Sequence, residues 1–153
     1  MTLVLPAGSL LYIDTSNTAT PTWTKLTEHN RNPVSLDPVR LEQVERMANG
    51  TMRKIFIADK MSISVSWTMV PSYSTMTVDS GYGAAELQAF YLAKGTGTFK
   101  VKISYNGSNS SRDQIKTMHF TSASFSINKR NVRNNVSDIG QEFWDASISL
   151  EEV

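Results

Sequence analysis

Hydrophobic and polar residues alternate along several stretches of this chain, and that alternation predicts β-strands. The clearest stretch is residues 62–70, where serine and threonine alternate with Ile63, Val65, Trp67 and Met69. A period of two places one set of side chains on the core face of an antiparallel sheet and the other set in solvent. Pro71 is expected to end this strand, because proline cannot donate a ladder hydrogen bond.

The same reasoning predicts strands at residues 9–13, 39–48, 51–58, 98–105, 116–127 and 141–150. Residues 98–105 would point Phe99, Val101, Ile103 and Tyr105 inward, and residues 141–150 would point Trp144, Ala146, Ile148 and Leu150 inward. In 116–127 the apolar residues change parity after Phe120. A bulge near Thr121 or Ser122 is therefore needed if both sets face the core. The stretch 14–22 is a loop by composition, and Trp23 is expected to re-enter the fold.

Residues 78–95 are the segment with the signals of a helix, which we place at about 83–94. Asp79 or Ser80 is a candidate cap for the first turn, and Gly95 can stop the helix in a left-handed conformation. Three- and four-residue steps give one face that can lie on a sheet, formed by Ala84, Leu87, Phe90, Tyr91 and Lys94.

About seven strands and one helix favour a mainly β fold, a β-sandwich or barrel with the helix covering one side. The 153 residues suit a single domain, 1–153. Residues 25–38 contain two prolines and are predicted to form an extended arm or irregular loop that could pack on a neighbouring subunit. Residues 39–58 are predicted to form a hairpin with a type I′ turn at Asn49-Gly50. Its flanks mix charges with few apolar residues of consistent parity, so we expect an assembly element rather than a core element.

Composition removes several classes of chemistry. The chain has no cysteine, which excludes disulfides, thiolate zinc sites, iron–sulfur clusters and cysteine nucleophiles. A net charge of +1 gives no bulk electrostatic reason for binding nucleic acid or a membrane. No apolar run approaches a membrane span, and the N-terminal run stops at Pro6 and makes a poor secretion signal. The sequons at Asn49, Asn106, Asn109 and Asn135 are interpreted as turn chemistry.

No catalytic, metal or cofactor motif is present, so the chain is not predicted to be an enzyme. His29 and His119 are far apart in sequence and neither has the spacing of a metal pair; His119 is predicted to point outward from its strand. Gly95-Thr96-Gly97 lacks the third glycine of a phosphate-binding loop. The polar loop 128–140 holds the cations Lys129, Arg130 and Arg133 without an interleaved aromatic residue, which favours a solvated surface.

Four segments in roughly the middle third of the chain resemble bacteriophage tail structural proteins, tail tube proteins in particular. They are Glu28-His29-Asn30-Arg31-Asn32-Pro33, Arg46-Met47-Ala48-Asn49-Gly50-Thr51-Met52-Arg53-Lys54, Ile57-Ala58-Asp59-Lys60 and Ser64-Val65-Ser66-Trp67. The resemblance implies a tail-tube-like fold with one flanking helix and long loops that reach neighbours. It also implies stacked rings of six around a lumen through which DNA passes, and an acidic lumen.

On this interpretation the protein is a virion structural protein that self-assembles in the bacterial host cytoplasm. Its partners are further copies of itself and other tail proteins, with DNA as passing cargo and no membrane or cofactor. The candidate assembly interface comprises Arg31, Pro33, Arg46, Asn49, Gly50, Arg53 and Lys54.

Two alternatives remain open at this stage. Another tail ring component (a distal tail, terminator or connector protein) would share the same sequence features. A carbohydrate-binding β-sandwich module, a different class of protein, would use exposed aromatic residues such as Trp23, Tyr73 or Tyr82. An uncharacterised hydrolase ranks behind both, because the sequence offers no convergent titratable pair.

Overall fold

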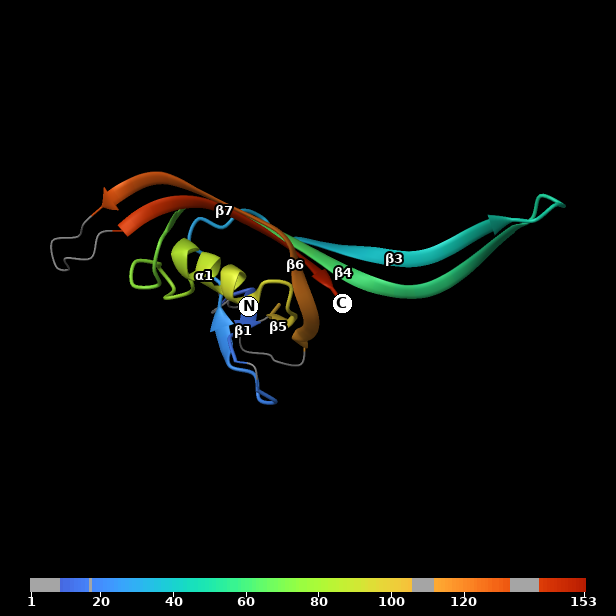
Figure 1. Ribbon diagram of the computed structural model, residues 1–153, viewed down its shortest axis with the longest axis horizontal. Coiled ribbons are helices and arrows are strands. Elements are labelled where there is room, and N and C mark those ends of the chain that lie inside the picture. Colours follow the sequence, from blue (N-terminus) through green and yellow to red (C-terminus); the bar gives the residue numbers. More distant parts are fainter. Residues whose placement is uncertain (1–8, 17, 106–111, 133–140) are drawn as a thin grey trace, which may run out of the picture.

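The structure is a computed structural model that describes residues 9–16, 18–105, 112–132 and 141–153. The mainly β prediction is confirmed. In chain order the elements are β1 (Leu11–Asp14), β2 (Trp23–Lys25), β3 (Ser35–Arg46), β4 (Met52–Pro71), α1 (Ala84–Lys94), β5 (Phe99–Ile103), β6 (Gln114–Val132) and β7 (Gln141–Glu152). The seven strands form one antiparallel sheet in the order β2-β1-β5-β6-β7-β4-β3 (Figure 1).

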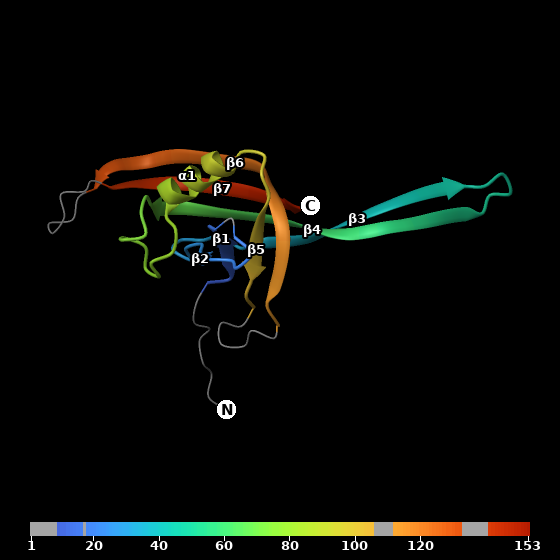
Figure 2. The same ribbon diagram turned by 60° about the horizontal axis from the view of Figure 1, so that its bottom comes forward.

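The core lies between this sheet and α1, which packs against one side of β6 and β7 (Figures 1 and 2). Alternation places Ile63, Val65 and Trp67 of β4 beside Ala146, Ile148 and Leu150 of β7, and all six side chains are buried. The predicted helix stripe contributes Ala84, Leu87 and Phe90 to the same core. Phe90 packs edge-to-face on Phe99, with ring centroids 5.1 Å apart, which joins the helix to β5.

The helix begins at a different cap from the one predicted. Gly83 is the N-cap, and Glu86 accepts a hydrogen bond from the Gly83 backbone N–H at 3.3 Å. A Cβ at position 83 would lie 2.5 Å from the carbonyl of Ser72, so only glycine fits this approach. Asp79 does not cap the helix but accepts hydrogen bonds from Thr27 and Glu28 of the predicted arm. Gly95 ends the helix with φ of +54°, as predicted.

Three predicted inward positions are wrong, and the errors at Met69 and Tyr105 have local causes. Met69 has φ of +55°, and the register of β4 against β7 shifts between Trp67 and Val70, so Val70 rather than Met69 is buried. Asp145 stabilises the shift by accepting a hydrogen bond from the Met69 N–H at 3.0 Å. Strand β5 ends at Ile103, which leaves Tyr105 exposed.

The bulge predicted in β6 is confirmed by a register shift between Phe120 and Ser122. Ile127, also predicted to face the core, is exposed.

Several predicted boundaries also move. Residues 51–58 and 62–70 belong to one continuous strand, β4, because Asp59, Lys60 and Met61 all pair with β3. Residues 35–38 of the predicted arm belong to β3, where Pro38 is tolerated because β3 is an edge strand. Residues 128–132 of the predicted loop belong to β6. The rest of that loop with Arg133, the predicted turn at 106–111, the N-terminal residues 1–8 and the sequons at Asn106, Asn109 and Asn135 lie outside the described residues.

Candidate assembly surface

Residues 39–60 of β3 and β4 form a two-stranded ribbon that projects from the body (Figures 1 and 2). The two strands pair from Ser35–Ser64 to Arg46–Met52, whereas β7 pairs with β4 only between Ser62 and Pro71. Within the described residues, the ribbon therefore has no third strand beside it, and both of its edges keep unpaired backbone groups. Two-stranded hairpins are marginally stable alone, and such open edges are templates for pairing with another chain.

The tip of the ribbon differs from the predicted type I′ turn. The Gly50 N–H donates to the Met47 carbonyl at 2.9 Å, and the Met47 N–H donates to the Thr51 carbonyl at 2.8 Å. Gly50 has φ of +84°, but Asn49 is not among the residues with positive φ. This is a three-residue loop closed by a left-handed glycine. The Asn49 side chain accepts from the Thr51 N–H at 3.0 Å, which fixes the loop by another route.

Opposite charges pair across the ribbon. Arg40 binds both carboxylate oxygens of Asp59, with the closer contact at 2.8 Å, and Lys54 lies 2.8 Å from Glu42. The hydrogen bond from Arg40 lowers the pKa of Asp59 below its ordinary value. Exposed ion pairs of this kind contribute little to stability. They do set the register and neutralise each other, so the ribbon presents little net charge along this part of its length.

The ribbon also exposes an unusual share of the apolar surface. Of the fourteen large hydrophobic side chains that are exposed among the described residues, seven lie in the ribbon, with exposed fractions from 44% to 65%: Leu41, Val44, Met47, Met52, Ile55, Phe56 and Ile57. Scattered single apolar residues are normal on a surface, but a concentration of this kind marks an interaction site.

The run Ile55-Phe56-Ile57 is a sequence signal of this exposed surface that the alternation pattern alone does not reveal. Three consecutive apolar residues cannot all face one side of a strand, so in a sheet that is covered on one face at least one of them is exposed.

The structure brings together five of the seven predicted interface residues and separates two. Arg46, Asn49, Gly50, Arg53 and Lys54 all lie in the distal part of the ribbon. Arg31 instead makes an ion pair with Glu28 at 2.6 Å within its own chain, and Glu28 accepts a hydrogen bond from the Leu10 N–H at 2.7 Å. Pro33 lies just before β3, at the base of the ribbon, beside a shallow hollow.

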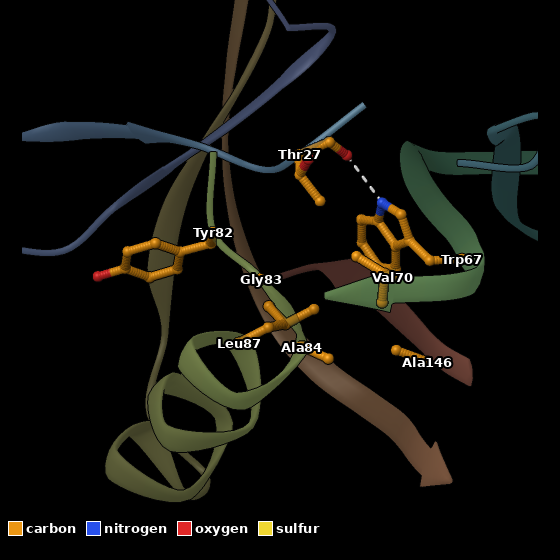
Figure 3. A pocket seen from close by; sticks show the side chains of 8 residues that line it. All are labelled: Thr27, Trp67, Val70, Tyr82, Gly83, Ala84, Leu87 and Ala146. Carbon is orange, nitrogen blue, oxygen red and sulfur yellow. Dashed lines mark hydrogen bonds between the residues drawn. The ribbon is translucent and has the colours of Figure 1, made fainter. Parts of the chain in front are cut away.

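The predicted arm is anchored to the body rather than free. Asp79 accepts hydrogen bonds from the Thr27 hydroxyl and the Glu28 N–H, both at 2.8 Å. Burial acts to raise the pKa of Asp79, but these bonds and one from the Gly81 N–H outweigh it and lower the pKa. The Trp67 indole N–H donates to the Thr27 carbonyl at 2.7 Å, inside an apolar niche beneath the start of α1 (Figure 3). The space left in this niche is too small for a water molecule, so it is a packed junction.

The remaining candidate residues do not converge on a chemical site. His29 accepts a hydrogen bond from the Val78 N–H at 3.3 Å. His119 of β6 is the cross-strand neighbour of Glu151 of β7, on the side of the sheet away from α1. The described residues contain no group of three His, Cys, Asp or Glu side chains that could hold a metal ion. Among them, no helix has the length and apolar character needed to cross a membrane.

The three aromatic residues considered for carbohydrate binding come from separate segments. Trp23 lies in β2, with the Lys102 ammonium 5.1 Å from its ring centre, whereas Tyr73 and Tyr82 lie in the connection between β4 and α1. Tyr73 is exposed, but Tyr82 is partly buried and contacts the niche beside Trp67.

Comparison with known proteins shows a likeness in fold to a solved tail structure. No protein-family model and no curated protein sequence matches this chain. Among solved structures, a chain in the tail of an empty GTA (gene transfer agent) particle, determined with helical refinement and C6 symmetry, is similar with a TM-score of 0.54. The two sequences are 7% identical, and the match covers 94% of this chain and 90% of that chain. The protein therefore shares its fold, over nearly its whole length, with a protein of a six-fold symmetric tail.

Proposed function

We propose that this protein is a structural subunit of a phage-like tail, and specifically the tail tube subunit that assembles into stacked rings of six. The projecting ribbon is the observation that carries the proposal. It combines two open strand edges with seven exposed apolar side chains, and a free monomer gains nothing from either feature.

The arrangement of the ribbon suits a head-to-tail contact. The ribbon leaves the body at one end of the sheet order. We propose that it docks on the body of the next copy, a surface different from the ribbon itself. A contact between two different surfaces repeats around a ring when the rotation closes. The number six comes from the likeness to a chain in a C6-symmetric tail.

The role that follows is mechanical rather than catalytic. Stacked rings enclose a conduit, and the subunit contributes to its wall in the virion after assembly in the host cytoplasm. Its partners are copies of itself and other tail proteins, and DNA passes as cargo without being recognised. The candidate interface is the distal ribbon with Arg46, Asn49, Gly50, Arg53 and Lys54, and the base of the ribbon near Pro33 and Arg31.

A second candidate is another ring of the tail, such as a distal tail, terminator or connector protein. The same ribbon favours it, because a single closed ring needs the same subunit contact as a stacked tube. The two candidates differ in their product, which is a long tube in one case and one closed ring, or a ring that needs a partner protein, in the other.

The test is to concentrate the full chain and examine it by light scattering and negative-stain electron microscopy. We expect rings or tubes from the natural sequence and none from Ile57→Asp, which places a charge in the ribbon. Val78→Asp is the matched control, because Val78 is also highly exposed but lies between β4 and α1. A species that stays monomeric at high concentration, and that other tail proteins do not change, would refute the proposal.

A further inference from the structure

The register of β3 against β4 tells which residues lie on each of the two faces of the ribbon. Leu36 of β3 pairs with Ile63 of β4, whose side chain is buried in the core. Because side chains alternate along a strand, the even-numbered residues of β3 lie on the α1 side of the sheet. The register shifts between Leu41 and Glu42, which leaves Ile57 of β4 without a partner. Beyond this bulge the even-numbered residues of β4 lie on the α1 side as well.

Two side-chain contacts agree with this assignment. The Arg40 guanidinium lies over the ring of Phe56, with its central carbon 5.7 Å from the ring centre. The Lys54 ammonium lies 2.8 Å from the Glu42 carboxylate. Residues on opposite faces of a strand pair could not make these contacts, so all four side chains share the α1 side.

Large apolar side chains are exposed on both faces of the ribbon. Val44, Met52 and Phe56 lie on the α1 side, and Leu41 and Ile55 lie on the opposite side. An antiparallel sheet that packs on one partner and faces water with its other side keeps polar residues on the solvated side. The ribbon does not follow that rule, because neither of its faces is polar throughout.

The remaining residues of both faces fit a protein partner. On the α1 side, two ion pairs across the strands neutralise each other's charges, and on the opposite side Arg53 is the cross-strand neighbour of Glu45. Methionine, phenylalanine and arginine are enriched where proteins contact each other, and the ribbon contains all three. A paired arrangement of charges gives little attraction for a polyanion.

We infer that the ribbon is held on both faces, by two different copies of this chain. This inference rests on the proposed tube function, in which a subunit has neighbours in its own ring and in the adjacent ring. One face of the ribbon is covered within the ring and the other face by the adjacent ring. Burial of both faces also supplies the packing that a two-stranded hairpin lacks when it is alone.

The shape of the chain supports two partners rather than one. The ribbon projects from the body, so that its two faces point in opposite directions (Figures 1 and 2). A single copy could cover both faces only with an apolar cleft that admits the ribbon. Two open hollows on the body are lined mainly by serines of β3, β4 and β7 and by polar residues of the segment 30–32, and neither is such a cleft.

The first test removes apolar side chains from one face at a time. The double variant Val44→Thr, Met52→Thr changes the α1 side, and the double variant Leu41→Thr, Ile55→Thr changes the opposite side. Threonine favours strands, and all four natural side chains are exposed, so both variants should fold as the natural protein does. Circular dichroism checks the fold, and electron microscopy shows how far each variant assembles.

We expect the two double variants to stop at different stages. One should form separate rings that do not stack into tubes, and the other should form no rings. The matched control is Val78→Thr, Ile115→Thr, which changes two exposed residues outside the ribbon and should form tubes. Tubes from either ribbon variant at the natural concentration, or arrest of both variants at the same stage, would overturn the inference.

The absence of cysteine allows a second test on the assembled protein. A photoactivatable crosslinker is attached to Val44→Cys or to Leu41→Cys, which lie on opposite faces of β3. Each variant is assembled with an excess of isotope-labelled natural protein, so that mass spectrometry distinguishes crosslinks between copies from crosslinks within one chain. We expect both positions to crosslink to labelled copies, and to two different segments of the chain.

The possible failures are distinguishable. Crosslinks between copies from only one position in intact tubes would show a ribbon that is covered on one face, and crosslinks from both positions to the same segment would show a single binding cleft. Either result overturns the inference and leaves the proposed function in place. If the natural protein forms only single rings, the inference fails together with the tube assignment, and if it forms no assembly at all, the proposed function fails as well.

Discussion

Phe56 offers the sharpest test of the ribbon, because its contribution to assembly can be separated from its contribution to folding. Its ring lies midway along β4 of the ribbon and is 58% exposed. Aromatic side chains bury about 150–250 Å² when they pack, so roughly 100 Å² of Phe56 is available to a neighbour. Complete burial of that area contributes about 2–3 kcal/mol for each subunit contact. Phe56→Thr should therefore raise the concentration needed for assembly by up to roughly 30- to 140-fold.

The same substitution should leave the fold nearly unchanged. Threonine, like phenylalanine, is a residue that favours strands. Within the chain, the substitution mainly removes the interaction of the ring with the Arg40 guanidinium, whose central carbon is 5.7 Å from the ring centre. An exposed cation–π interaction is worth about 0.5–1 kcal/mol, so the free energy of unfolding should fall by about that amount. Arg40 keeps its ion pair with Asp59.

The assay is sedimentation of assembled protein over a concentration series, with melting followed by circular dichroism. Ile115→Thr is the control, since Ile115 of β6 is 56% exposed and lies on the body rather than on the ribbon. The reasoning is wrong if Phe56→Thr assembles at the natural concentration, or if Ile115→Thr shifts assembly by the same factor.

Three further substitutions test other parts of the structure. Gly50→Val should cost about 1–3 kcal/mol; because φ is +84° and an added Cβ would meet no other atom, the cost is backbone strain rather than a clash. Circular dichroism should show a folded body and electron microscopy should show no polymer, while Gly50→Asn should assemble. Trp67→Phe leaves the buried Thr27 carbonyl without its donor and should lower the free energy of urea unfolding by at least about 1–3 kcal/mol. Asp79 has a folded-state pKa below its ordinary value of 3.8, so its contribution to stability is present above that pH and is lost as pH falls through the folded pKa. The difference in melting temperature between natural protein and Asp79→Asn should therefore shrink on acidification, and a constant difference would contradict this.

Local sequence patterns predicted the structural features that depend on residues close together in the chain. The alternation in residues 62–67, the parity change at Phe120 and the helix stop at Gly95 all report on side chains within a few positions of each other. They are visible in the sequence because burial follows a period of two in strands and 3.6 in helices. The mainly β fold and the distal part of the ribbon, with Asn49 and Gly50, were accessible for the same reason.

Long-range contacts decided the features that the sequence did not predict. The N-cap at Gly83 depends on the close approach of Ser72, and the outward turn of Met69 depends on Asp145, 76 positions later. Two collinear alternating segments look the same in sequence as two strands folded back on each other, so the continuity of β4 could not be predicted. The Asn-Gly pair is compatible with more than one short loop, and its flanking residues did not choose between them.

The position of β7 has a consequence for how the chain folds as it is made. In chain order β7 follows β3, β4 and β6, yet in the sheet it lies between β6 and β4 and provides the pairing that joins them. During vectorial synthesis the β3–β4 hairpin and the strands β1, β2, β5 and β6 must therefore exist as two unconnected sheets until residues 141–152 have emerged. Closing them requires contacts between residues about eighty positions apart, such as Val65 with Ile148, which makes the last step slow. A nascent subunit thus has its apolar ribbon before its body is complete. The pairing of β7 with β4 and β6 then joins the two sheets into one.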